Sequence, residues 1–145
     1  MLSRRSWRPT ARDSWRPVLE IPGGRPAWHI GLEDPREPGR CWTGVGVNNM
    51  AVATSGDYLR SFQREGRRYG HILDVRTGRP VANECLAVSV IAPQCILAGM
   101  LSTTAFVLGP EEGARLLGST YQVEGCIVTA HTRFPTRRFF EFATS

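Results

Sequence analysis

Alternation of apolar and polar residues predicts short strands in the first half of the chain. Residues 27–34 alternate well enough for one strand, and the Asp-Pro-Arg-Glu-Pro-Gly run at its end predicts a turn. Residues 41–47 and 50–54 predict two further strands, joined as a hairpin across Asn48 and Asn49. The first half of the chain is therefore expected to be rich in strands.

Longer apolar runs dominate the second half. A continuous apolar run predicts a buried strand over residues 85–92, and residues 95–108 are apolar on nearly every side, which predicts a buried helix. A short amphipathic helix over 111–117 and strands over 121–129 and 138–142 complete the pattern. Together the elements predict an α+β domain with a layered antiparallel or mixed sheet and two to three helices.

The central stretch from residue 53 to 78 carries the densest set of turn signals. Residue types that cap helices, followed by apolar spacing, predict a helix over residues 57–65 that ends at Gly66. Residues 69–74 predict a strand that carries His71. A turn closed by a second glycine follows this strand.

The polar groups of this stretch suit an anionic ligand such as a phosphate. Backbone amides at two glycine turns and arginine guanidinium groups donate hydrogen bonds to anions. Histidine is the side-chain type best suited to moving a proton near neutral pH. Two interpretations stay open at this point: an anion-binding site, and two loops with ordinary helix caps.

Composition and charge narrow the function classes. The chain has 145 residues, enough for one domain with its own core, and a net charge of +5. All 18 basic residues are arginine, so no lysine is available for Schiff-base chemistry or a phosphate loop. Six arginines lie in the first 25 residues and the others are scattered. We therefore expect no nucleic-acid partner, although the basic balance keeps nucleic-acid binding as a minor alternative.

Residues 1–19 are rich in arginine, tryptophan and proline, and we expect them to form a poorly ordered arm. Residues 20–145 are expected to form the folded domain. The four cysteines show neither a C-x-x-C pair nor zinc spacing. Cys85, Cys95 and Cys126 lie in apolar runs, which predicts buried free thiols. The sequence has no run of 18 apolar residues, so no transmembrane helix is predicted. We recognise no signal peptide.

Two motifs in the central stretch resemble those of the FAD:protein FMN transferase family, the ApbE-type flavin transferases. The first is Ala-Thr-Ser-Gly-Asp-Tyr at residues 53–58, and the second is His-Ile-Leu-Asp-Val-Arg-Thr-Gly-Arg-Pro at residues 71–80. Val75 stands where the family has proline. The resemblance covers roughly residues 20–135 and corresponds to the C-terminal portion of the family. A partial ApbE-like domain is therefore expected, without the upstream half.

The resemblance implies a transferase that uses FAD as substrate, with Mg²⁺, and attaches FMN to a threonine of an acceptor protein while AMP leaves. It implies His71 as the catalytic base. The residues implied in cofactor binding are Thr54, Ser55, Gly56, Asp57, His71, Asp74, Arg76, Thr77 and Gly78.

A metal site is also implied on the predicted helix over residues 95–108. In the family an aspartate and a threonine four residues later hold Mg²⁺, and four residues is one helical turn. Thr103 matches the threonine, whereas Gly99 occupies the aspartate position. Losing that carboxylate is expected to weaken metal binding, because Mg²⁺ prefers hard oxygen ligands that include carboxylates. The alternative for Thr103 is a hydroxyl bonded to the carbonyl of residue 99.

We therefore expect a flavin transferase domain that is weak or inactive alone. The alternative is a non-catalytic flavin-binding or partner-binding remnant of the family. Apolar surface left exposed by a missing half-fold would favour a homo-oligomer or a complementing polypeptide. Without a signal peptide the chain as it stands is expected to be cytoplasmic, whereas family members are often periplasmic or membrane-anchored.

Overall fold

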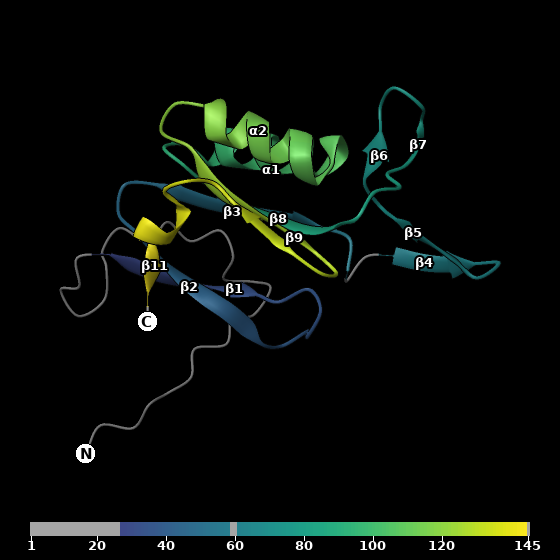
Figure 1. The fold of residues 1–145 in the computed structure, drawn as a ribbon, viewed down its shortest axis with the longest axis horizontal. Coiled ribbons are helices and arrows are strands. Elements are labelled where there is room, and N and C mark those ends of the chain that lie inside the picture. Colours follow the sequence, from purple (N-terminus) through teal and green to yellow (C-terminus); the bar gives the residue numbers. More distant parts are fainter. Residues whose placement is uncertain (1–26, 59–60, 145) are drawn as a thin grey trace, which may run out of the picture.

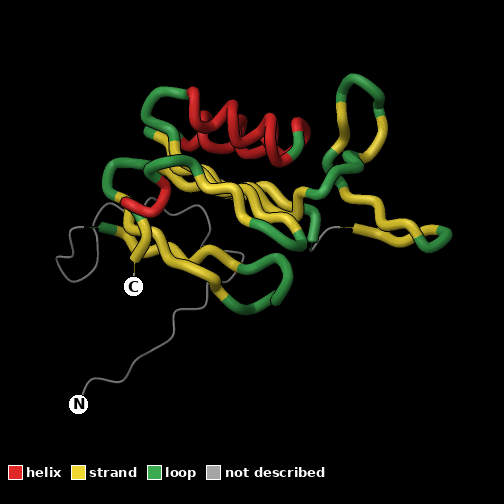
Figure 2. Tube along the Cα trace, in the orientation of Figure 1, coloured by secondary structure: helices red, strands yellow, loops and turns green. Residues whose placement is uncertain are grey.

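The computed structural model describes residues 27–58 and 61–144, and it has three layers. Two helices cover one face of a four-stranded sheet, and a three-stranded sheet lies against the other face (Figure 1; Figure 2). The predicted α+β class with antiparallel sheets and two helices is confirmed. The predicted arm at residues 1–19 lies outside the described residues.

The strands are β1 (Trp28–Glu33), β2 (Cys41–Val47), β3 (Ala51–Gly56), β4 (Ser61–Arg64), β5 (Arg67–Gly70), β6 (Leu73–Asp74), β7 (Arg79–Pro80), β8 (Cys85–Ala92), β9 (Glu124–Thr129), β10 (Arg133–Pro135) and β11 (Ala143–Thr144). The helices are α1 (Cys95–Leu108) and α2 (Pro110–Ser119), with a short 3-10 helix at Phe139–Glu141. The four-stranded sheet has the order β10-β9-β8-β3, and the three-stranded sheet has the order β1-β2-β11. Two separate hairpins, β4-β5 and β6-β7, project from one end of the layers (Figure 1).

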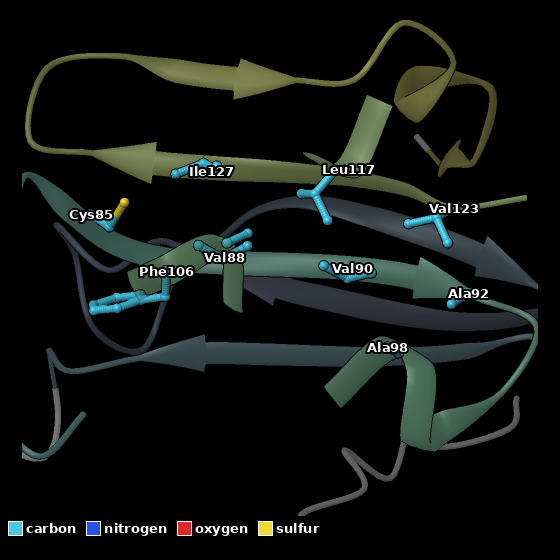
Figure 3. Packing of buried hydrophobic residues seen from close by; sticks show 10 residues of the cluster. Cys85, Val88, Val90, Ala92, Ala98, Phe106, Leu117, Val123 and Ile127 are labelled. Atoms are coloured by element: carbon cyan, nitrogen blue, oxygen red, sulfur yellow. The ribbon is translucent and has the colours of Figure 1, made fainter. Parts of the chain in front are cut away.

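β8 is an inner strand of the four-stranded sheet, and both of its faces are buried. Val88 and Val90 point into the core under the helices, where they meet Phe106 and Ile127 (Figure 3). Ile91 belongs to the second core, between the two sheets. Alternate side chains of one strand thus serve two cores, which explains why its sequence is continuously apolar.

α1 has the predicted bounds but not the predicted burial. Its inner face, which includes Ala98 and Phe106, packs on the sheet. Ile96 and Met100 on its outer face are 70% and 61% exposed. The prediction of a buried helix is therefore wrong: an apolar sequence all round the helix did not ensure a covering layer on each side.

The predicted hairpin between residues 41–47 and 50–54 is wrong, although both strands exist. β2 pairs with β1 and β11, whereas β3 pairs with β8. The chain crosses from one sheet to the other between them, with Asn49 in the left-handed region at φ 52°. A local turn signal marked the reversal, but partners distant in the sequence decided the pairing.

The predicted helix over residues 57–65 is also wrong. Residues 61–64 form β4, which pairs with β5 through a two-residue turn at Glu65 and Gly66. Both turn residues have positive φ, 53° and 74°, which is the turn type whose twist suits a two-residue hairpin. Gly66 was expected to end a helix, and it lies instead in the turn of a hairpin.

Two further expectations about strands need correction. The strand predicted over residues 69–74 is interrupted, because β5 ends at Gly70 and β6 begins at Leu73. The strand predicted over residues 138–142 is a 3-10 helix followed by β11. Among the described residues, no helix has both the length and the apolar character needed to cross a membrane.

Asp34, at the end of β1, ties the three-stranded sheet to β10. Its carboxylate accepts bonds of 2.8 Å from both the Arg36 and the Arg133 guanidinium groups, and Arg133 also lies over the Trp42 ring. Hydrogen bonding from Arg36 first, and the charge of Arg133 in addition, hold the pKa of this buried carboxyl well below its usual range. The ionised form is therefore favoured by folding.

Asp34→Asn should lower the free energy of unfolding by about 1–2 kcal/mol at neutral pH. A depressed pKa in the folded state gives stability that is present above the unfolded pKa of about 3.9 and is lost as the pH falls. The difference in free energy of unfolding between Asp34→Asn and the natural chain should therefore become smaller below about pH 4. Urea unfolding at several pH values checks this, with Glu37→Gln, an exposed carboxylate paired with Arg40, as control. Parallel stability curves for Asp34→Asn and the natural chain would contradict this assignment.

Candidate functional site

A hollow of about 620 Å³ opens between the end of β3, the loop after β5 and the middle of α1. It is lined by Thr54, Ser55, Gly56, Tyr58, His71, Ile72, Leu73 and Thr103. Three segments distant in the sequence therefore meet at one place. His71 lies in the short loop between β5 and β6, and its side chain is exposed and faces this hollow.

Hydroxyl groups join β3 to α1 at the floor of the hollow. The Ser55 hydroxyl lies 2.8 Å from that of Ser102 and 2.9 Å from that of Thr103. Ser102 and Thr103 in turn donate to the carbonyl of Gly99 at 3.0 and 3.1 Å. The Ser55 side chain on β3 is therefore within hydrogen-bond distance of two successive residues of α1. The second strand hydroxyl, that of Thr54, lies 2.9 Å from that of Ser89 on β8.

Ser55→Ala should lower the free energy of unfolding by about 1 kcal/mol, because it removes the bridging hydroxyl between β3 and α1. Thermal or urea unfolding measures the change. Ser119→Ala is the matched control, since its exposed hydroxyl bonds only locally, to Leu116 in the same helix. Equal losses of stability in the two variants would mean that the bridge adds nothing.

Tyr58 closes one side of the hollow and is held from β1. Its hydroxyl donates to the Glu33 carboxylate at 2.7 Å. Burial, and then the bond to Glu33, raise the pKa of Tyr58 to about 12, so its phenol stays protonated at neutral pH. The Glu33 pKa is lowered, first by the bond from the Gly39 amide and then by that from Tyr58. This pair holds one wall of the hollow in place.

The structure divides the predicted site residues between two places. Thr54, Ser55, Gly56, His71 and Thr103 share the hollow above. Asp74, Arg76 and Thr77 line a second hollow of about 570 Å³, beside the β6-β7 turn and the end of α1.

The opposite charges of Asp74 and Arg76 pair with each other at the β6-β7 turn. Arg76 donates to both carboxylate oxygens of Asp74, at 3.0 and 2.8 Å, and that bonding lowers the Asp74 pKa. Gly78 has φ 65°, as its place in the turn requires. The Asp57 side chain packs against Gly70 at the base of the β4-β5 hairpin, where a larger residue than glycine would collide with it.

A magnesium ion fits these residues poorly. The cluster at Thr103 offers hydroxyls and one carbonyl, and no carboxylate joins it among the contacts of the described residues. Within residues 27–58 and 61–144, no three His, Cys, Asp or Glu side chains gather as a metal site would require. Thr103 bonds the carbonyl of Gly99, which is the structural alternative raised by the sequence.

The cysteines play no part in this site. Cys85 and Cys126 are buried free thiols, and burial raises the pKa of each to about 12, so neither is a ready nucleophile. Cys41 and Cys95 are exposed free thiols, which corrects the expectation that Cys95 is buried.

Three lining residues were missed as site residues in the sequence analysis: Tyr58, Ile72 and Leu73. Each directly adjoins a predicted site residue, which was the available signal. Ser102 was missed as well, and only its contact with Ser55 across 47 positions identifies it. Such a contact depends on the pairing of β3 with the sheet beneath α1, which the sequence did not predict.

The fold and site define a three-layer α+β protein with a hydroxyl- and histidine-lined hollow between sheet and helix. The sequence profile of the ApbE family matches residues 18–127. The chain therefore belongs to the ApbE family.

Several named proteins are similar to this chain. The FAD:protein FMN transferase of Haemophilus influenzae is 33% identical over 116 residues, 79% of this chain and 33% of the relative. That of Treponema pallidum is 38% identical over 112 residues, 77% of this chain and 30% of the relative. The chain thus spans about a third of the length of these curated relatives.

Solved structures agree with the family assignment. The ApbE protein of Thermotoga maritima superposes with a TM-score of 0.74 at 33% identity, covering 84% of this chain and 40% of that one. The flavinyl transferase ApbE of Pseudomonas stutzeri, in its apo form, superposes with a TM-score of 0.66 at 36% identity, covering 80% and 37%.

Proposed function

We propose that the hollow beside His71 binds FAD and serves the transfer of FMN to a threonine hydroxyl of an acceptor protein. The observation that carries this proposal is the meeting of His71 with the Thr54–Gly56 corner and Thr103 around one hollow. Names of the relatives support it, since those proteins are FAD:protein FMN transferases. The Thr54–Gly56 corner, which lines the hollow, would face the diphosphate.

In the proposed step, the threonine oxygen bonds to the phosphorus of the FMN half. The bond from that phosphorus to the bridging oxygen breaks, so AMP leaves with that oxygen. His71 takes the hydroxyl proton as the new bond forms and then returns it to solvent or to AMP. Tyr58 and Glu33 keep the wall beside this reaction in place.

Mg²⁺ supplies charge stabilisation at phosphoryl oxygens when it is bound. We propose that its binding is weak in this chain, because Gly99 brings no carboxylate to the Thr103 cluster. Slow transfer follows from that proposal. The same observation favours a second candidate function, flavin binding without transfer.

Two assays on one sample test these proposals. FAD binding is measured by fluorescence titration, and AMP release is measured with a threonine peptide, with and without Mg²⁺. We expect FAD to bind and AMP to appear slowly. If FAD did not bind, the proposed function would be overturned. Rapid Mg²⁺-dependent release of AMP would overturn the proposal that Mg²⁺ binds weakly. Binding with no release under any condition would favour the second candidate.

A further inference from the structure

The two projecting hairpins lie immediately before and after His71 in the chain. β4 and β5 pair only with each other among the described strands, and so do β6 and β7 (Figure 1). We name residues 61–70 and 73–80 together the twin hairpins. Isolated two-stranded ribbons are marginal in water, so side chains that project from them seldom serve a core.

Each of the twin hairpins carries exposed apolar side chains. Phe62 is 59% exposed, Leu73 is 52% exposed and Val75 is 91% exposed. Phe62 stacks on Tyr69 across the first ribbon, with ring centroids 5.3 Å apart. The hairpins thus hold three of the eight exposed large hydrophobic residues among those described. Apolar residues gathered on a projecting surface are typical of a protein-binding site.

The twin hairpins are also basic. Five arginines stand against Glu65 and Asp74, a net charge of +3 that is more than half of the charge of the whole chain. Arg76 is already paired with Asp74. Arg79 lines the hollow of about 570 Å³, and Arg64 is exposed on the first ribbon, 3.7 Å from the similarly exposed Glu65 carboxylate. An acidic partner would complement this surface.

We propose that the twin hairpins are the docking surface for the acceptor protein, and that the docked segment carries acidic residues beside apolar ones. This inference rests on the proposed function, since it assumes that an acceptor hydroxyl must reach His71. Arginines attract the acidic residues, and Phe62, Leu73 and Val75 cover the apolar ones. Aliphatic side chains such as Leu73 and Val75 have little to offer a phosphate backbone, which favours a protein over a nucleic acid.

Peptide binding tests the proposal directly. Two fluorescein-labelled 15-residue peptides carry a central threonine and two leucines; one has four flanking acidic residues, and the other has lysines in their place. Fluorescence anisotropy should show the acidic peptide binding about tenfold more tightly to the natural chain. Equal binding of both peptides would overturn the proposal. So would tighter binding of a 15-nucleotide single-stranded DNA, which would indicate a nucleic-acid surface.

Variants separate local docking from overall charge. Arg64→Glu with Arg79→Glu should weaken binding of the acidic peptide about tenfold. Arg115→Glu with Arg137→Glu, in α2 and in the loop after β10, makes the same change in net charge elsewhere and should have a smaller effect. Val75→Ser should weaken binding about threefold, because it removes an apolar contact. Equal weakening by the two double variants would overturn the proposal.

FAD titration of the same samples separates this inference from the proposed function. Intact FAD binding with no preference for the acidic peptide would reject only the docking surface. If the natural chain did not bind FAD, the proposed function itself would be rejected.

Discussion

His71→Gln should lower the rate of AMP release from FAD by roughly 10²–10⁴-fold, the usual contribution of a positioned general base. Glutamine keeps a polar side chain of similar reach but does not take up the threonine proton. His71 is exposed at the hollow, so the change should leave the fold nearly as it was.

Single-turnover AMP release, measured in the Gly99→Asp chain so that the rate is high enough to follow, checks this prediction. His131→Gln is the matched control, because His131 is an exposed histidine in the turn after β9. A similar rate for His71→Gln and His131→Gln would remove His71 from the mechanism.

Gly99→Asp should raise the affinity for Mg²⁺ by about 10- to 100-fold, because it adds a carboxylate one helical turn before Thr103. A side-chain carbon at residue 99 would meet no other atom within 4 Å, so the new group has room. Aspartate is also no worse than glycine inside a helix, so α1 should persist.

Isothermal titration with Mg²⁺ measures this change without relying on activity. Gly118→Asp in α2 is the matched control, since a side chain there also meets no atom within 4 Å. An unchanged Mg²⁺ affinity in Gly99→Asp would mean that Thr103 and its neighbours are not arranged as a latent metal site.

Elements set by long apolar runs were predictable from the sequence. β8 and α1 have the predicted bounds, because each run is long, apolar and ended by proline or glycine. The β4-β5 hairpin was not predictable, because its turn begins with Glu65 in a left-handed conformation that glutamate seldom adopts. The partner of β3 was missed because pairing with β8 joins residues far apart in the sequence.

The candidate site was predictable as a list of residues but not as a geometry. The two motifs placed Thr54–Gly56 and His71 in one site, and those residues do share a hollow. The motifs did not indicate that Asp74 and Arg76 would neutralise each other beside a different hollow. Sequence proximity cannot separate those cases, because hydrogen bonding within a short turn competes with binding of a ligand. Their roles in binding FAD stay predictions.

The most direct test asks whether FAD occupies the hollow beside His71. FAD affinity is compared in Thr103→Glu and Thr104→Glu, with EDTA present. Thr103 lines the hollow and Thr104 is its exposed neighbour on α1, so only the first substitution sets a negative charge against the diphosphate. We predict at least about tenfold weaker binding for Thr103→Glu and little change for Thr104→Glu. Equal affinities in the two variants would contradict the placement of FAD in this hollow.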